Sequence, residues 1–158
     1  MNVMGVRDTG DLIKFLEPFD EKTVELALWL RKFVWKQYPR ANELIYDNYN
    51  AVAFGWSTTL KVTDIFGSVA VYGNEKLHLG FNWGSRLTDP EKVLLGDGKQ
   101  YRFVRLTSKK DFPADYIKEL LAEANINSLA NAKDLGSAPH GQTVVKSISP
   151  KKKRTGSK

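Results

Sequence analysis

Residues 76–83 alternate between large apolar side chains and polar or small ones. The apolar positions are Leu77, Leu79, Phe81 and Trp83. The positions between them are Lys76, His78, Gly80 and Asn82. Because successive side chains of a strand point to opposite faces of a sheet, this period of two predicts a strand with one apolar and one polar face.

Four other short segments have the composition of strands. They are rich in Tyr, Val, Phe and Thr, are broken by Asn and Gly, and span residues 44–49, 51–56, 65–72 and 101–106. Between 65–72 and 76–83, Gly73 and Asn74 tolerate the positive φ that a tight hairpin requires. The pattern therefore predicts an antiparallel meander.

Two helices are predicted before the first strand. Thr9 or Asp8 is a suitable N-cap for a short helix that ends at Glu17. Asp20 is a suitable N-cap for a longer helix that runs to Gln37. Most of the longer helix is apolar, so we expect it to be largely buried against the sheet.

A third helix is predicted after the strands. Pro113 suits its first turn, and apolar residues then recur at helical spacing: Tyr116, Ile117, Leu120, Leu121 and Ala124. The expected fold class is α+β, an antiparallel sheet of about five strands with two N-terminal helices and one C-terminal helix packed on it.

Composition changes near the end of the chain. Large apolar residues become rare beyond Asn131, and from Gly136 onward Ser, Pro, Gly, Gln and Lys dominate. Such a composition buries too little apolar surface to offset the entropy of ordering. We expect one α+β domain over residues 1–130 and a disordered basic tail over residues 131–158.

The charge of the chain is concentrated in that tail. The formal net charge is +6, and residues 141–158 hold six cations and no acid. Residues 1–140 therefore carry 18 basic and 18 acidic side chains, which argues against nucleic-acid binding by the domain itself. Non-specific contact of a polyanion with residues 151–158 stays open.

The chain has no cysteine, which excludes disulfides, thiolate catalysis and Cys-ligated metal sites. It also has no apolar run long enough for a membrane span, and Asp8 and Asp11 interrupt the region where a secretory signal would lie. We therefore expect a soluble cytoplasmic protein without membrane contact.

Several short motifs occur along residues 10–125: Pro39, Glu43, the YDNYNA segment at 46–51, Gly84, Leu87, Asp89-Pro90, Leu95-Gly96, Gly98-Lys99 and Arg102. In this order they resemble the YdhG-like family of small bacterial domains of unknown function. The resemblance implies a compact α+β domain with helices on an antiparallel sheet. Residues 46–50 depart from the Tyr-Gly-x-Pro-x-Tyr pattern of many members, so a different ligand is expected.

The segment 46–50 is the strongest candidate for a binding surface. Aromatic rings provide contact area, and Asp and Asn side chains fix orientation. The leading hypothesis is a small non-enzymatic binding domain of unknown ligand, with a pocket at one sheet edge formed by Tyr46, Asp47, Tyr49 and Asn50. In the alternative interpretation these residues shape a turn and cover the core.

Gly96-Asp97-Gly98-Lys99 either forms a tight turn or holds a small anion between Lys99 and Arg102. We also expect Arg102 to extend into the pocket formed by residues 46–50. The glycine spacing and the Gln100 that follows Lys99 do not match a P-loop. Asp89-Pro90 resembles the start of a helix.

Two alternatives concern other classes of function. One YdhG-like lineage has been proposed to act as a frataxin-like iron chaperone, and that resemblance implies Asp20, Glu21 and Glu25 as iron ligands, although Lys and Arg residues interleave with these acids. The other alternative is an enzyme with Asp47 as general base. Apart from iron, no cofactor is expected, and the expected partner is a small molecule or a protein.

The two histidines provide little support for catalysis or metal binding. His78 lies on the polar face of its strand, where a solvated or hydrogen-bonded ring is expected. His140 falls in the predicted tail, so a catalytic triad or a His-rich metal site is difficult to assemble.

Overall fold

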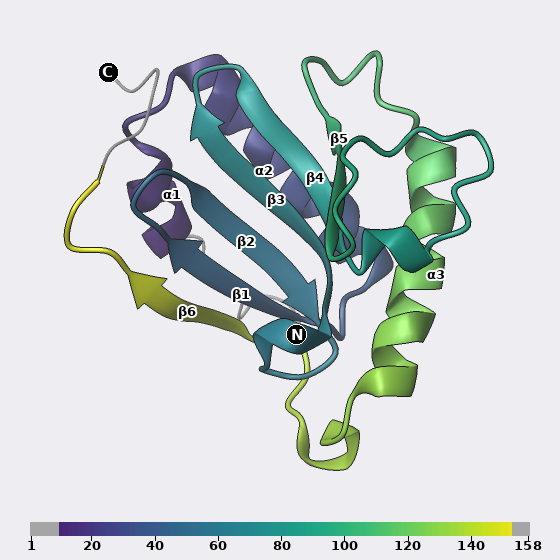
Figure 1. Ribbon diagram of the computed structural model, residues 1–158. Coiled ribbons are helices and arrows are strands. Elements are labelled where there is room, and N and C mark those ends of the chain that lie inside the picture. The colour runs from purple at the N-terminus through teal and green to yellow at the C-terminus, as the bar shows by residue number, and fades with distance from the viewer. Residues whose placement is uncertain (1–9, 153–158) are drawn as a thin grey trace.

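Six strands form one sheet in the computed structural model, which describes residues 10–152 (Figure 1). The strands are β1 (Asn42–Asp47), β2 (Val52–Ser57), β3 (Ile65–Gly73), β4 (Lys76–Asn82), β5 (Tyr101–Arg105) and β6 (Thr143–Ile148). Their order in the sheet is β5-β4-β3-β2-β1-β6. All neighbours are antiparallel except β1 and β6, which are parallel. The antiparallel meander predicted from the sequence is therefore confirmed.

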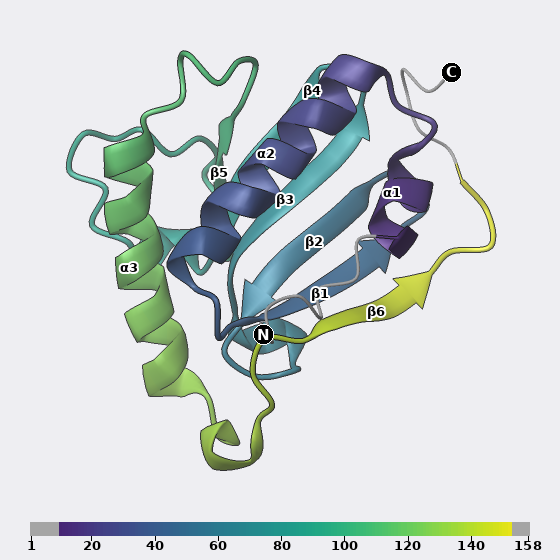
Figure 2. The same cartoon turned by 180° about the vertical axis from the view of Figure 1, so that it is seen from behind.

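Three helices lie on one face of this sheet, as predicted. They are α1 (Gly10–Leu16), α2 (Glu21–Gln37) and α3 (Ala114–Asn131). Figure 2 shows α1 and α2 in front of the sheet and α3 beside it next to β5, so Figure 1 looks onto the opposite face. Asp20 caps α2, since its carboxylate accepts a hydrogen bond of 2.9 Å from the backbone N–H of Thr23. The predicted caps Asp8 and Thr9 lie outside the described residues.

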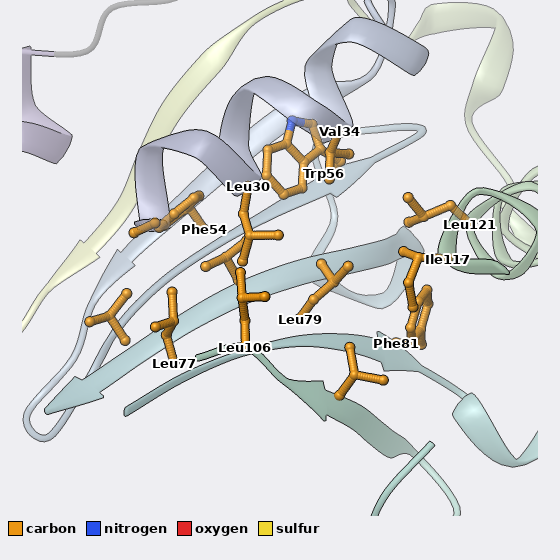
Figure 3. Packing of buried hydrophobic residues seen from close by; sticks show 14 of the residues in the cluster. Leu30, Val34, Phe54, Trp56, Leu77, Leu79, Phe81, Leu106, Ile117 and Leu121 are labelled. Carbon is orange, nitrogen blue, oxygen red and sulfur yellow. The ribbon is translucent and has the colours of Figure 1, made fainter. Parts of the chain in front are cut away.

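The core forms between the helices and the apolar face of the sheet. Side chains of α2 and α3 point toward alternate residues of β4 (Figure 3): Leu30, Val34, Ile117 and Leu121 from the helices, and Leu77, Leu79 and Phe81 from β4. Each is buried, and full burial of such a side chain contributes about 1.5–3 kcal/mol. This burial confirms the apolar face predicted from the period of two.

Trp83 does not continue this apolar face. β4 ends at Asn82, and Trp83 has a left-handed backbone conformation with φ of 58°. Its ring is half-buried, and the Arg86 guanidinium lies 4.7 Å from the ring centroid. The strand pattern therefore ends one residue earlier than predicted, because the chain turns there into a short 3-10 helix at Gly84–Arg86.

The predicted hairpin between β3 and β4 forms, with a different residue at positive φ. Glu75, rather than Gly73 or Asn74, has φ of 58°. The backbone N–H of Glu75 donates to Thr23 Oγ1 at 2.7 Å, and Asn74 Oδ1 accepts from the N–H of Asp20 at 2.7 Å. These contacts join the hairpin to the first turn of α2 and stabilise the strained backbone at Glu75.

The prediction of a disordered tail from residue 131 is wrong for residues 143–148. They form β6, in which Val144 pairs with Leu44 and Val145 with Ile45. The average composition of residues 131–158 did not predict this strand, because two adjacent β-branched residues in a polar segment are enough to extend an existing sheet. Residues 153–158 lie outside the described residues.

The predicted helix start at Asp89-Pro90 is also wrong. Residues 88–94 form an irregular loop, and Asp89 has φ of 37°. The Asp89 carboxylate accepts hydrogen bonds from the N–H groups of Val93 and Leu94, as a helix cap would, but the chain continues as a loop. Tyr116 of α3 donates a third hydrogen bond of 2.6 Å to the same carboxylate and fixes the loop on α3.

Candidate functional site

A pocket of about 300 Å³ lies where α2 ends and β1 begins. We call it the α2–β1 pocket. Four segments that are far apart in the sequence contribute its walls: Gln37, Tyr38, Pro39, Arg40 and Ala41 between α2 and β1, Thr58 after β2, Asn125 and Leu129 on α3, and His140 before β6. Its volume falls at the lower end of the range for small-molecule sites.

The segment before β6 is held against the start of β1 by backbone and side-chain hydrogen bonds. Asn42 Nδ2 donates to the carbonyl of Pro139 at 2.8 Å, and Asn42 Oδ1 accepts from the N–H of Gln142 at 3.2 Å. The N–H of Gly141 donates to the carbonyl of Arg40 at 3.1 Å. Gly141 has φ of 69°, a conformation that glycine adopts without strain. Asn42 is fully buried, so these bonds place His140 firmly on the pocket wall.

The polar groups of the α2–β1 pocket favour a negative ligand. None of its lining residues is acidic, and within residues 10–152 no carboxylate pairs with the exposed Arg40. Burial raises the pKa of Tyr38, so its phenol stays protonated at neutral pH and keeps its hydrogen-bond donor. Arg40, Tyr38 and Asn125 therefore provide donors around one volume.

The pocket also has apolar lining residues. Leu129 is 44% exposed although it is a large apolar residue, and Pro39 and Ala41 also line the pocket. The Tyr38 ring packs edge-on against the ring of Phe66, with centroids 5.1 Å apart, which holds Tyr38 in place. A ligand with an apolar part and an anionic group fits this division of the surface.

The residues predicted to bind a ligand lie at the other end of β1. Tyr46 is half-buried and Asp47 is 4% exposed, and as neighbours in a strand they point to opposite faces of the sheet. Tyr49 and Asn50 are exposed in the turn between β1 and β2, where the N–H of Asn48 donates to the carbonyl of Ala51. The structure thus places two of these residues on β1 and two in the turn that follows it, and does not direct all four at one volume.

Asp47 is engaged with the segment after β6. Lys152 Nζ lies 2.8 Å from Asp47 Oδ2 and also donates to the carbonyl of Ser149. The N–H of Ser149 donates to the carbonyl of Asp47 at 2.7 Å. The Lys152 ammonium group therefore already pairs with the Asp47 carboxylate, which was predicted from the sequence as an alternative general base.

Lys99 and Arg102 lie at the opposite edge of the sheet, so the expectation that Arg102 reaches residues 46–50 is wrong. Arg102 is on β5, and three strands separate β5 from β1. Arg102 Nε donates to the carbonyl of Gly98 at 3.1 Å, and the exposed Lys99 accepts at its carbonyl from Ser85 Oγ. Gly96 has φ of 94°, in agreement with the interpretation of this segment as a turn that needs glycine.

The predicted iron ligands have other partners. Asp20 caps α2, and Glu25 Oε1 lies 3.1 Å from Lys109 Nζ. Glu21 is exposed in the first turn of α2. Among the residues that the structure describes, no group of three or more His, Cys, Asp or Glu side chains could hold a metal ion.

Local sequence patterns do not identify the α2–β1 pocket. Its walls come from four segments, and each one alone looks like a helix end, a loop or a solvated helix face. His140 was predicted to lie in a disordered tail, and only the pairing of β6 with β1 brings it to the pocket. Leu129 is a large apolar residue in the mostly polar second half of α3, but so is Ile126, which does not line the pocket.

The chain has no match among family models, curated proteins or solved structures. The resemblance to YdhG-like domains therefore stays a prediction. Within the described part of the chain, no helix is both long enough and apolar enough to cross a membrane.

Proposed function

We propose that this protein is a small non-enzymatic binding domain, and that its ligand is a small organic anion held in the α2–β1 pocket. One observation carries the proposal: a preformed pocket lined by neutral donors, apolar residues and Arg40, in which no described lining residue is acidic and no carboxylate of residues 10–152 pairs with Arg40. The proposal keeps the function class expected from the sequence and moves the site from residues 46–50 to the start of β1.

In this proposal Arg40 binds the anionic group of the ligand. A guanidinium offers several donors in a fixed plane and pairs well with carboxylate or phosphate oxygens. Tyr38 and Asn125 add neutral donors, and Leu129 contacts the apolar part of the ligand. The Thr58 hydroxyl is hydrogen-bonded to Ser128 Oγ at 2.7 Å, and within the described residues no hydrogen bond joins it to His140, which is why the proposal is binding and not catalysis.

The test is a titration of the ¹⁵N-labelled full-length protein with a panel of small carboxylates and phosphate monoesters, followed by amide NMR spectra. We expect saturable shifts at the amides of Tyr38, Ala41, Asn125 and Leu129. Arg40→Gln removes the charge and should weaken binding about ten-fold or more, because a hydrogen bond to a charged group contributes about 1.5–3 kcal/mol.

Arg105→Gln is the matched control, since Arg105 is an exposed arginine of β5 at the far edge of the sheet. It should bind the panel as the wild type does. The proposal fails if no member of the panel shifts the pocket amides, or if Arg40→Gln and Arg105→Gln have the same effect.

The alternatives from the sequence gain no support from the geometry. Asp47 is ion-paired with Lys152, and two of the three proposed iron ligands cap a helix or pair with a lysine. A cytoplasmic location remains part of the proposal, because a chain without cysteine is compatible with a reducing compartment.

A further inference from the structure

The sheet face opposite the helices carries a cluster of four aromatic rings. They come from three adjacent strands: Tyr72 of β3, His78 of β4, and Tyr101 and Phe103 of β5. We call them the ring cluster. Neighbouring ring centroids are 4.5–5.9 Å apart, and all four side chains are half-buried. In Figure 1 no helix crosses in front of β3 and β4 on this face.

The strand register explains why these rings share one face. His78 pairs with Arg105, and Gly80 pairs with Phe103, so alternate residues of β4 and β5 point away from the helices. A Cβ atom at Gly80 would lie 2.1 Å from the ring of Tyr101. Gly80 is therefore required for Tyr101 to lie across β4, where its hydroxyl is 2.8 Å from His78 Nδ1.

The rings are uncharged at neutral pH. Burial first, and then the Arg105 guanidinium, lowers the pKa of His78 to about 4. Burial raises the pKa of Tyr101. The cluster is a platform of neutral π faces, with a cation at its margin, because Arg105 Cζ lies 5.6 Å from the Phe103 ring centroid.

The charged strand residues of this face have one sign. The only carboxylates on the six strands are Glu43 and Asp47, and both lie on the helix side, where Arg31 and Lys152 pair with them. The strand positions that point away from the helices include Lys76 and Arg105 next to the ring cluster. Residues 1–140 have no net charge in total, but the charged strand residues of this face are positive.

We infer that this face binds single-stranded nucleic acid, with bases stacked on the ring cluster and phosphates paired with Arg105 and Lys76. Stacking of bases on aromatic side chains beside a positively charged surface is a general mode of single-strand binding. Three adjacent strands span about 10 Å, which accommodates two or three bases. On this face no described helix projects from β3, β4 or β5 to enter a duplex groove, so we expect single strands to bind in preference to duplex.

This inference is independent of the α2–β1 pocket, because Arg40 and the ring cluster lie on different parts of the molecule. It departs from the expectation that the domain itself has no affinity for nucleic acid. That expectation used the total charge, whereas a polyanion responds to the local arrangement of charges.

The test is fluorescence anisotropy of the full-length protein with labelled oligothymidylate and oligouridylate of about eight nucleotides. Phe103→Leu and Tyr72→Leu keep apolar volume but remove a π face, and each should weaken binding about five-fold or more. Arg105→Gln should weaken binding and lower the slope of log affinity against log salt by about 0.7, the value for one phosphate on a single strand.

Two controls separate the face from the basic tail and from the pocket. Arg40→Gln should bind the oligonucleotide as the wild type does. A variant with Lys151, Lys153 and Arg154 changed to Gln keeps Lys152 on Asp47, and it should retain the dependence of binding on Phe103 and Arg105. Thermal melts of each variant verify that it is folded.

Four results would overturn the inference. The first is no binding to either oligonucleotide, which would leave the face to a protein partner. The second is unchanged binding by all three face variants, and the third is equal competition by a duplex of the same length. The fourth result is that the tail variant loses binding while Phe103→Leu and Arg105→Gln bind as the wild type does. This result would assign the affinity to the tail alone.

Discussion

At the scale of single residues, His78 shows how neighbours change a side chain that the sequence presents as ordinary. On the polar face of an isolated strand it would be solvated and would titrate near pH 6.5. In the structure Tyr72, Tyr101 and Phe103 surround it, and Tyr101 occupies its Nδ1. The expected hydrogen-bonded histidine is confirmed, but its partners are aromatic residues from two other strands.

We expect acid to destabilise the protein through His78. Its pKa is about 4 in the folded state and about 6.5 when unfolded, so the unfolded state binds the proton more readily. Its contribution to stability is complete above pH 6.5 and is lost as the pH falls toward 4, to a limit of about 3 kcal/mol. His78→Phe should flatten the dependence of unfolding free energy on pH in this window, as measured by urea denaturation. An unchanged slope would contradict the assignment.

Asp89 holds an irregular loop through one carboxylate. Burial alone would raise its pKa, but hydrogen bonds from Tyr116, Leu94 and Val93 and the nearby Arg102 charge hold the pKa of Asp89 below its usual value. The backbone at Asp89 is strained, with φ of 37°, and these bonds offset the strain.

Asp89→Ala should destabilise the protein by about 1–3 kcal/mol, because it leaves two backbone N–H groups and the Tyr116 hydroxyl without their acceptor. Since the folded pKa is depressed, the stabilisation is present above the unfolded pKa near 4 and is lost as the pH falls through the folded value. Denaturation of the variant at pH 7 and at pH 3 measures both effects. An equal difference from the wild type at the two pH values would show that the carboxylate charge is not involved. Glu91→Ala, in the same loop, is the control.

At the scale of elements, β6 completes a charged cluster in the core. Glu43 of β1 is fully buried and accepts hydrogen bonds from Arg31 of α2 at 2.7 and 2.5 Å. Thr143, the first residue of β6, donates a third at 3.0 Å. A buried ion pair is tolerable only when such hydrogen bonds satisfy its oxygens, so β6 is coupled to the packing of α2.

Deletion of residues 136–158 should therefore lower stability by several kcal/mol. It removes a strand and opens Glu43 to partial solvation. It should also abolish ligand binding at the α2–β1 pocket, because His140 and the hydrogen bonds of the Asn42 side chain to Pro139 and Gln142 are lost. Calorimetry and the NMR titration measure the two effects. Deletion of residues 153–158 alone, which leaves β6 and Lys152 in place, should behave as the wild type. A 136–158 deletion with wild-type stability would contradict the role of β6.

At the scale of the whole molecule, stability should decrease from the centre of the sheet to its β6 edge. β3 lies between β2 and β4 and is covered by α2 and α3 on one face, whereas β6 is half-exposed to exposed along its length. In native-state hydrogen exchange we expect β3 amides to exchange only by global unfolding, and β6 amides to exchange earlier by local opening. Equal protection of β3 and β6 would show that the tail folds as part of one cooperative unit.

The sequence determined the elements whose cause is local. Alternation in β4, the Asp20 cap of α2 and helical spacing in α3 each depend on residues a few positions apart, and all three predictions are confirmed. The α+β class followed from their order along the chain. The position of a binding site is not local in this sense, because residues 46–50 were predicted as the site from their composition alone.

Tertiary structure decided what depends on pairing between distant segments. β6 exists because Val144 and Val145 meet the free edge of β1, a partner about a hundred residues earlier that composition averaged over the tail does not reveal. The same pairing places His140 on the α2–β1 pocket and brings Lys152 to Asp47. The pairing of β5 with β4 places Arg102 far across the sheet from Tyr46. Hydrophobic periodicity specifies which face of an element is buried, whereas the order of strands in a sheet specifies which side chains meet.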